Sequence, residues 1–193
     1  MLYLVRHGET ILPKGICIGQ TDIPMAQKGI ENITQKTLPH LLALHVESPS
    51  IVASPLQRTM TTAQIFAQEF SVEIEQDPAL QEIDMGKWDG LAFTYIKKHW
   101  AAEYEERGQN FAHFQAPEGE SFSDVQQRAL EAILPLCQRP EPVVIVTHAG
   151  VIRSLLCAAN QTPLQELFTY TPKTGSITLL SKETFRCKSL YLQ

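Results

Sequence analysis

Paired cysteines are missing from this sequence. Its four cysteines, Cys17, Cys137, Cys157 and Cys187, lie far apart and never form a C-x-x-C pair. That spacing argues against both a zinc site and a disulfide framework. We therefore expect a protein of the reducing cytoplasm.

A long uninterrupted hydrophobic run is also missing. The most apolar stretch, residues 143–159, is interrupted by His148 and Arg153. The first residues do not combine a basic region with an apolar core, as a secretory signal would. We expect neither a membrane span nor a signal peptide.

Positive charge is scarce. The chain has 16 Lys and Arg against 21 Asp and Glu, a net charge of −5, and no cluster of basic residues. This balance argues against nucleic acid as a partner. A phosphate-bearing ligand would need a local concentration of positive charge in a cleft. The sequence gives no indication of the oligomeric state.

The composition is that of an ordinary globular protein. The chain has 193 residues, 44% of them hydrophobic and 19% charged, which suits one domain or one domain with an insertion. Short β-branched runs alternate with stretches of helical period, which is typical of an α/β domain. The expected strands are residues 2–5, 51–53, 72–75, 143–147, 176–180 and 186–192. The expected helices are residues 27–44, 55–70, 121–137 and 149–160.

Residues 90–120 follow no single period. We interpret this stretch as a partly helical insertion over one end of the sheet, and thus as a candidate cap over a substrate, although a plain structural excursion fits equally well. Ser121 and Asp124 then have the spacing of a capping box. The helix that they begin has an apolar face formed by Phe122, Val125, Ala129 and Ile133.

Polar residues follow three of the expected strands. Arg6 and His7 follow the first, a segment containing Arg58 follows the strand at 51–53, and His148 follows the strand at 143–147. Ligands in open α/β sheets bind beyond the carboxyl ends of the strands. Two arginines and two histidines are therefore expected in one cleft.

These residue types suit phosphoryl transfer. Arginine forks stabilise the charge on a transferring phosphoryl group, a role that fits Arg6 and Arg58. A histidine whose other ring nitrogen is held by a hydrogen bond can attack phosphorus, and either His7 or His148 would serve. The leaving alkoxide needs a proton from a carboxylic acid. Glu82 is the favoured acid, and Asp84 is its near competitor.

Four motifs together closely resemble the histidine phosphatase superfamily, which has a phosphoglycerate mutase-like fold. They occur in the family's order from residue 2 to about residue 155. The motifs are Leu4-Val5-Arg6-His7-Gly8-Glu9-Thr10, Ser54-Pro55 with Arg58, Leu80 and Glu82 with Gly86-Lys87-Trp88-Asp89-Gly90, and Thr147-His148-Ala149-Gly150.

The resemblance implies a three-layer α/β/α sandwich with a mostly parallel central sheet, forming a single domain over residues 1–193. It implies that His7 becomes the phosphohistidine, that Arg6, Arg58 and His148 hold the phosphoryl oxygens, and that Glu82 protonates the leaving group and later assists a water. Neither a metal nor another cofactor is implied.

One position departs from the family. Many members have an asparagine six residues after the nucleophilic histidine, where its amide helps to hold phosphate, whereas this chain has Pro13. Proline has no N–H to donate and fixes the local backbone. Lys14, Gln20 or backbone amides are the candidates to take over that contact.

The expected partner is a small phosphorylated metabolite. Residues 17–25 look like the corresponding loop of the α-ribazole-5'-phosphate phosphatase branch, which acts in cobalamin biosynthesis. The alternatives are a broad-specificity sugar or small-metabolite phosphatase, a phosphoglycerate mutase and, from another class, a non-catalytic phosphate-binding regulatory protein.

Overall fold

A mostly parallel β-sheet forms the centre of the protein, as expected. The computed structural model describes residues 1–189, with side chains through residue 185. Within this range the sheet has five strands in the order β3-β2-β4-β1-β5. β5 pairs antiparallel with β1, and the other neighbours are parallel. The strands are β1 (Leu2–Arg6), β2 (Ser50–Ala53), β3 (Ile74–Gln76), β4 (Val143–Thr147) and β5 (Ile177–Leu180).

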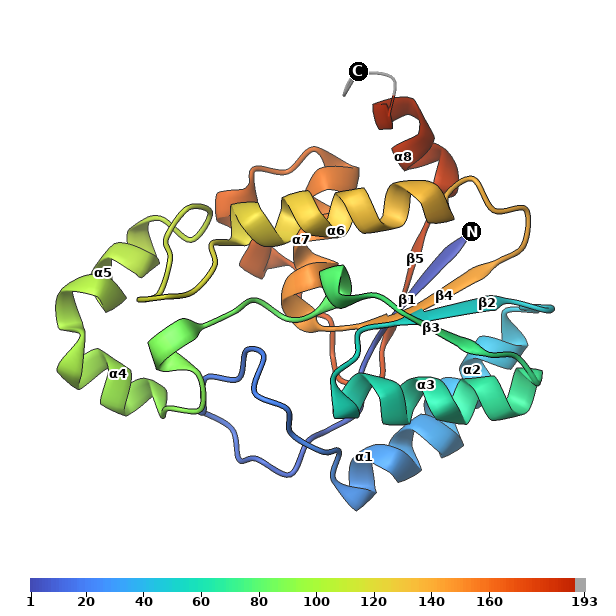
Figure 1. Cartoon of the computed structure of the whole chain (residues 1–193), viewed down its shortest axis with the longest axis horizontal. Coiled ribbons are helices and arrows are strands. Elements are labelled where there is room, and N and C mark those ends of the chain that lie inside the picture. The colour runs from blue at the N-terminus through green and yellow to red at the C-terminus, as the bar shows by residue number, and fades with distance from the viewer. Residues whose placement is uncertain (190–193) are drawn as a thin grey trace.

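Helices cover both faces of the sheet, which confirms the three-layer arrangement (Figure 1). One face carries α1 (Gln27–Asn32), α2 (Leu38–Ala43) and α3 (Gln57–Phe70), and the other carries α6 (Phe122–Leu136) and α7 (Ala149–Asn160). Successive residues of a strand point to opposite faces, so β1 contributes to two cores. Tyr3 and Val5 belong to the core on the α3 side, and Leu2 and Leu4 to the core on the α6 side.

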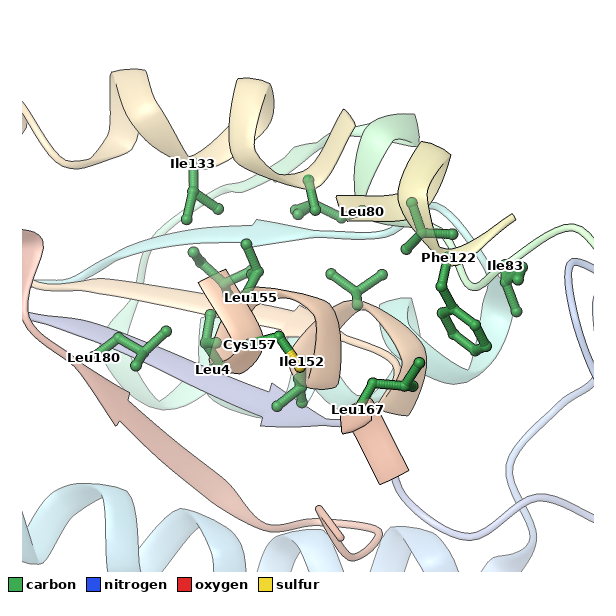
Figure 2. Packing of buried hydrophobic residues seen from close by; sticks show 14 of the residues in the cluster. Leu4, Leu80, Ile83, Phe122, Ile133, Ile152, Leu155, Cys157, Leu167 and Leu180 are labelled. Carbon is green, nitrogen blue, oxygen red and sulfur yellow. The ribbon is translucent and has the colours of Figure 1, made fainter. Parts of the chain in front are cut away.

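The core under α6 and α7 is the larger of the two. Leu4 packs there among Ile133 of α6 and Ile152 and Leu155 of α7, all fully buried (Figure 2). A side chain of this size contributes about 1.5–3 kcal/mol on burial. This packing fixes both helices, and with them the first turn of α7, against the sheet.

The helix expected over residues 27–44 is interrupted in the structure. Residues Ile33–Thr37 form a π-helical segment between α1 and α2, and the Leu38 N–H donates to the Ile33 carbonyl five residues earlier. Pro39 accounts for the interruption, because its ring lacks an N–H and would clash with a carbonyl in a continuous α-helix.

The prediction of a strand over residues 186–192 was wrong for its first part. Residues 186–189 belong to α8 (Lys182–Ser189), and residues 190–192 lie outside the described range. The Glu183 N–H donates to the Ser181 hydroxyl where the helix begins, and Phe185, in the next turn, is fully buried. The burial of Phe185 within a helix therefore outweighs the β-prone composition of residues 186–192.

The strand expected at 72–75 begins two residues later. Ser71 ends α3 in the left-handed conformation, with φ of 54°, and the Val72 N–H donates back to the Ala67 carbonyl. The backbone at Val72 is therefore still part of the helix end.

Residues 90–120 contain two helices, α4 (Phe93–His99) and α5 (Ala101–Gln109), at one end of the sheet (Figure 1). The fully buried Trp88 anchors them, with its ring 6.4 Å from Tyr104 and 5.3 Å from Phe114 between centroids. The segment is thus partly helical, as expected, while its role as a cap stays a prediction.

The capping box at the start of α6 is present. The Ser121 hydroxyl accepts from the Asp124 N–H, and the Asp124 carboxylate accepts from the Ser121 N–H. The predicted apolar face of this helix is buried.

Short 3₁₀ turns occupy residues Pro78–Leu80, Gly86–Trp88 and Leu164–Thr169. Among the helices that the structure describes, none is both long and apolar enough to cross a membrane.

Candidate active site

The three strand ends singled out by the motifs meet at one edge of the sheet. β4 lies between β1 and β2, and the His7 N–H donates to the Thr147 carbonyl at 3.1 Å. The Ser54 N–H donates to the Val146 carbonyl at 3.0 Å. These bonds extend the strand pairing by one residue and thereby bring His7 and His148 together.

The ring of His7 is held in one tautomer. Its Nδ1 lies 2.7 Å from the Gly8 carbonyl oxygen, and because a carbonyl can only accept, Nδ1 carries the proton. Burial, together with the charges of Arg58 and Arg6, lowers the pKa of His7 from 6.5 to about 3. His7 is therefore neutral at pH 7, with the lone pair on Nε2.

His148 lies beside His7, with ring centroids 5.2 Å apart and the planes tilted by 58°. It is fully buried, and its Nε2 lies 2.8 Å from the Ser54 hydroxyl. Burial, then the neighbouring His7 and Arg58, hold the pKa of His148 well below its usual range. The site thus places two neutral imidazoles next to fixed cations.

Arg58 is 1% exposed although it carries a charge. It lies in the first turn of α3, and its guanidinium donates to the carbonyls of Gly19 at 2.7 Å and Thr21 at 2.9 Å. Burial lowers the pKa of Arg58, and the charge of Glu82 opposes that shift. The two carbonyls fix the plane of the guanidinium.

The loop that holds Arg58 is itself fixed by two aspartates. Asp22 accepts from the Gln57 N–H at 2.7 Å and so caps α3 from outside the helix. The carboxylate of Asp89 accepts from the N–H groups of Gly19 and Thr21, both at 2.8 Å. Asp89 belongs to the motif Gly86-Lys87-Trp88-Asp89-Gly90, but this role for it was not predicted from the sequence.

Three buried nitrogens of the site have no hydrogen-bond partner among the residues that the structure describes. They are Arg6 Nε, Arg58 Nε and His148 Nδ1. Leaving a buried polar group unpaired costs about 1–3 kcal/mol, so such groups call for an explanation. An anion with several oxygens beside His7 would accept from the two arginine nitrogens.

Glu82 faces the same cleft and is 9% exposed. Its carboxylate accepts from the Gly150 N–H at the start of α7 and from its neighbour Ile83 N–H. Asp84 instead accepts from the Gly86 N–H at 2.8 Å within a turn and does not line the cleft. The geometry therefore brings Glu82, rather than Asp84, to the site.

The cleft has a volume of about 600 Å³ and is strongly cationic. Gln20 does not line it, because its side-chain amide donates to the Glu82 carbonyl at 3.1 Å. Pro13 and Lys14 do line it, and so do Lys28 and Lys173, which were not predicted from the sequence. The charged lining residues are Arg6, Arg58, Lys14, Lys28, Lys173, Glu9 and Glu82.

The described residues contain no group of three or more His, Cys, Asp or Glu side chains placed to hold a metal ion. What the cleft does contain is the neutral imidazole of His7, two guanidiniums and a carboxyl group, while the fully buried His148 lies against His7 without lining the cleft. That combination suits transfer of a phosphoryl group to a histidine.

Comparison with known families supports this chemistry. The model of the histidine phosphatase superfamily (branch 1) matches residues 2–192. The 6-phosphofructo-2-kinase/fructose-2,6-bisphosphatase of Arabidopsis thaliana is 31% identical over 171 residues, which are 86% of this chain and 22% of that relative. The chain thus spans about a fifth of that relative's length.

Solved structures agree with the match. YhfR of Bacillus stearothermophilus is 34% identical, with a TM-score of 0.81 over 92% of this chain and 88% of the other. A putative alpha-ribazole-5'-P phosphatase from Escherichia coli is 25% identical, with a TM-score of 0.80 over 91% and 87% of the two chains.

Proposed function

Because the chain belongs to the histidine phosphatase superfamily, we propose that it hydrolyses phosphate monoesters through a phosphohistidine at His7. The observation that carries this proposal is the bond from His7 Nδ1 to the Gly8 carbonyl, which leaves the Nε2 lone pair for attack. Both the neutral state of His7 and the adjacent guanidiniums suit that role.

The reaction proceeds in two steps. His7 Nε2 forms a bond to phosphorus as the ester P–O bond breaks, and the Glu82 carboxyl gives its proton to the leaving oxygen, which departs as an alcohol. Arg6 and Arg58 stabilise the charge on the phosphoryl oxygens, and the ring of His148 lies against that of His7. Water then attacks the phosphohistidine, Glu82 takes its proton, and inorganic phosphate leaves.

A phosphoenzyme experiment tests the mechanism. The wild-type protein, quenched during turnover of a ³²P-labelled ester, should carry label that is stable in alkali and lost in acid, whereas His7→Ala should carry none and show no turnover. Full activity of His7→Ala would refute the mechanism. A non-catalytic phosphate-binding protein would show no turnover at all.

α-Ribazole 5'-phosphate is the first candidate substrate. Its support is the loop at residues 17–25, together with the likeness to the structure of the putative alpha-ribazole-5'-P phosphatase of Escherichia coli. The cleft also has apolar walls at Leu12, Ile16 and Ile18, which suit an aromatic base.

A second candidate class is favoured by the lysines of the cleft. Lys14, Lys28 and Lys173 line it, and the ammonium group of none of them makes a hydrogen bond or an ion pair with the side chains and backbone described through residue 185. Such cations suit an ester with a second anionic group, such as a sugar bisphosphate. The likeness to fructose-2,6-bisphosphatase relatives agrees with this class.

One panel separates the candidates. It compares kcat/KM for α-ribazole 5'-phosphate, fructose 2,6-bisphosphate, 3-phosphoglycerate and simple sugar phosphates. The triple variant of Lys14, Lys28 and Lys173 to Ala should lower kcat/KM only for esters with a second anionic group. The decrease should be largest at low salt. A flat profile in the wild type would indicate a broad-specificity phosphatase.

A further inference from the structure

The segment that carries Glu82 has little regular structure of its own. It follows a short 3₁₀ turn. Side chains from elsewhere in the fold donate hydrogen bonds to its backbone carbonyls. The Thr147 hydroxyl donates to the Leu80 carbonyl at 2.7 Å, and Gln20 donates to that of Glu82. The position of the proposed acid therefore depends on residues outside the segment.

Arg128 of α6 supplies most of this pairing. One of its terminal nitrogens donates to the carbonyls of Ala79 at 2.7 Å and Gln81 at 2.8 Å, and the other donates to that of Glu82 at 3.1 Å. An arginine has five N–H donors. Three of them are used on this one stretch of backbone.

The remaining two donors bind Glu120. Arg128 Nε and a terminal nitrogen each lie 2.9 Å from one oxygen of that carboxylate, in a bidentate pair. Glu120 also accepts from the Asp84 N–H at 2.9 Å, and its own N–H donates to the Asp84 carbonyl at the same distance. Arg128 and Glu120 thus hold the segment on both sides of Glu82.

We infer that Arg128, paired with Glu120, is a positioning residue for catalysis, which sets the place of the Glu82 carboxyl in the cleft. Arg128 does not line the cleft, so it acts through Glu82 and not on the substrate. This inference rests on the proposed function, in which Glu82 is the proton donor.

The consequence is a specific pattern of rates. An ester with a poor leaving group needs an acid to protonate the leaving oxygen. The leaving group of an activated ester such as 2,4-dinitrophenyl phosphate departs without that proton. A displacement of a reacting group by about 1 Å, caused by a mutation away from the chemistry, can cost about 100-fold in rate. Arg128→Gln should lose about that factor in kcat on an alkyl phosphate and change little on the activated ester.

A double-variant experiment tests the inference. Rates on both esters are measured for the wild type, Glu82→Gln, Arg128→Gln and the double variant. If Arg128 acts through Glu82, its substitution has no further effect on the alkyl phosphate once Glu82 is Gln. Equal losses on both esters, or losses that multiply in the double variant, would overturn the inference.

The outcomes separate this inference from the proposed function. If Glu82→Gln itself shows no preference between the esters, the role of Glu82 fails. If Glu82→Gln shows the preference and Arg128→Gln does not, only the positioning role fails. Arg139→Gln is the matched control, because Arg139 also binds a glutamate with two hydrogen bonds, at 2.6 and 2.8 Å from Glu75. This control variant should keep wild-type rates on both esters.

A second variant covers a failure of Arg128→Gln to fold, which thermal unfolding would reveal. Glu120→Gln keeps Arg128 and the size of the side chain at 120, but it removes the charge and replaces one acceptor oxygen by an NH2 group that cannot accept from Arg128 or from the Asp84 N–H. It should show the same preference between esters as Arg128→Gln, with a smaller loss. Wild-type rates in a folded Glu120→Gln on both esters would count against the paired arrangement.

Discussion

Both carboxylate oxygens of Glu82 lie close to the backbone nitrogen of Gly150, at 3.1 and 3.2 Å. This contact needs a residue without a side chain. A Cβ on Gly150 would overlap the Glu82 carboxylate and would come within 3.1 Å of the Phe122 ring. The first turn of α7 and the proposed acid are therefore fitted to each other.

Gly150→Ala should displace Glu82 and lower kcat on alkyl phosphates by about 100-fold, since a shift of about 1 Å in a reacting group costs that much. Steady-state rates measure the loss. Gly108→Ala, in α5, is the matched control, because a Cβ there meets nothing within 4 Å. Wild-type kcat in Gly150→Ala would contradict the fit described above.

His7 should make the protein less stable in acid. Its pKa is lowered to about 3 by burial, so between pH 6.5 and 3 the unfolded chain binds a proton that the folded chain does not. As the pH is lowered through this range, this group therefore decreases the free energy of unfolding by about 1.4 kcal/mol per pH unit. His7→Asn should remove that slope.

Urea denaturation at intervals from about pH 7 to pH 4 measures this difference. Above the unfolded-state pKa the group is neutral in both states and adds no pH dependence. An identical slope in His7→Asn and in the wild type would mean that His7 is protonated in the folded protein.

Arg58→Lys should impair phosphoryl transfer although it keeps the charge. Lysine has no planar fork to donate to both Gly19 and Thr21 and still face the cleft. Loss of one donor to transition-state charge costs about 10²–10³-fold in kcat. The exposed pair at Arg139 offers a control, and Arg139→Lys should keep wild-type rates.

Ser121→Ala should lower the free energy of unfolding by about 1 kcal/mol, because it removes the cap of α6. Ser123→Ala in the same turn, whose hydroxyl makes no hydrogen bond within the described residues, should change it by less than about 0.5 kcal/mol. Urea titration compares the two. Equal effects would show that the cap contributes nothing specific.

Metal removal should leave activity unchanged, because the proposed chemistry uses a histidine and a carboxyl group. Hydrolysis of a chromogenic phosphomonoester is measured after dialysis against EDTA and again after addition of Mg²⁺ or Zn²⁺. Loss of activity that either ion restores would require a different mechanism.

Sequence reasoning located the side chains that follow strands. Arg6 and His7 come directly after one apolar run, and His148 follows another after a single threonine. Because the ends of parallel strands share an edge, their meeting could be predicted. The preference for Glu82 over Asp84 agrees with the cleft lining, but it was made without the turn that occupies Asp84.

The contacts that sequence reasoning missed involve the backbone. Arg128 and Gln20 both bind carbonyls of the segment before and at Glu82, and no pattern of residue types reveals which carbonyls lack partners. Lys28 and Lys173 reach the cleft from distant segments. The π-helical segment was also missed, although Pro39 was a signal that a continuous helix would be broken.

The order of the strands has a consequence for how the protein reaches its active form. The site requires β4 between β1 and β2, and β1 at the start of the chain pairs with β4 in its last third. Such distant pairing is slow, because chain closure costs entropy before any contact repays it. On dilution from urea, helical signal should therefore return before turnover, since no early intermediate that lacks the β1–β4 pair would hold His7 beside His148.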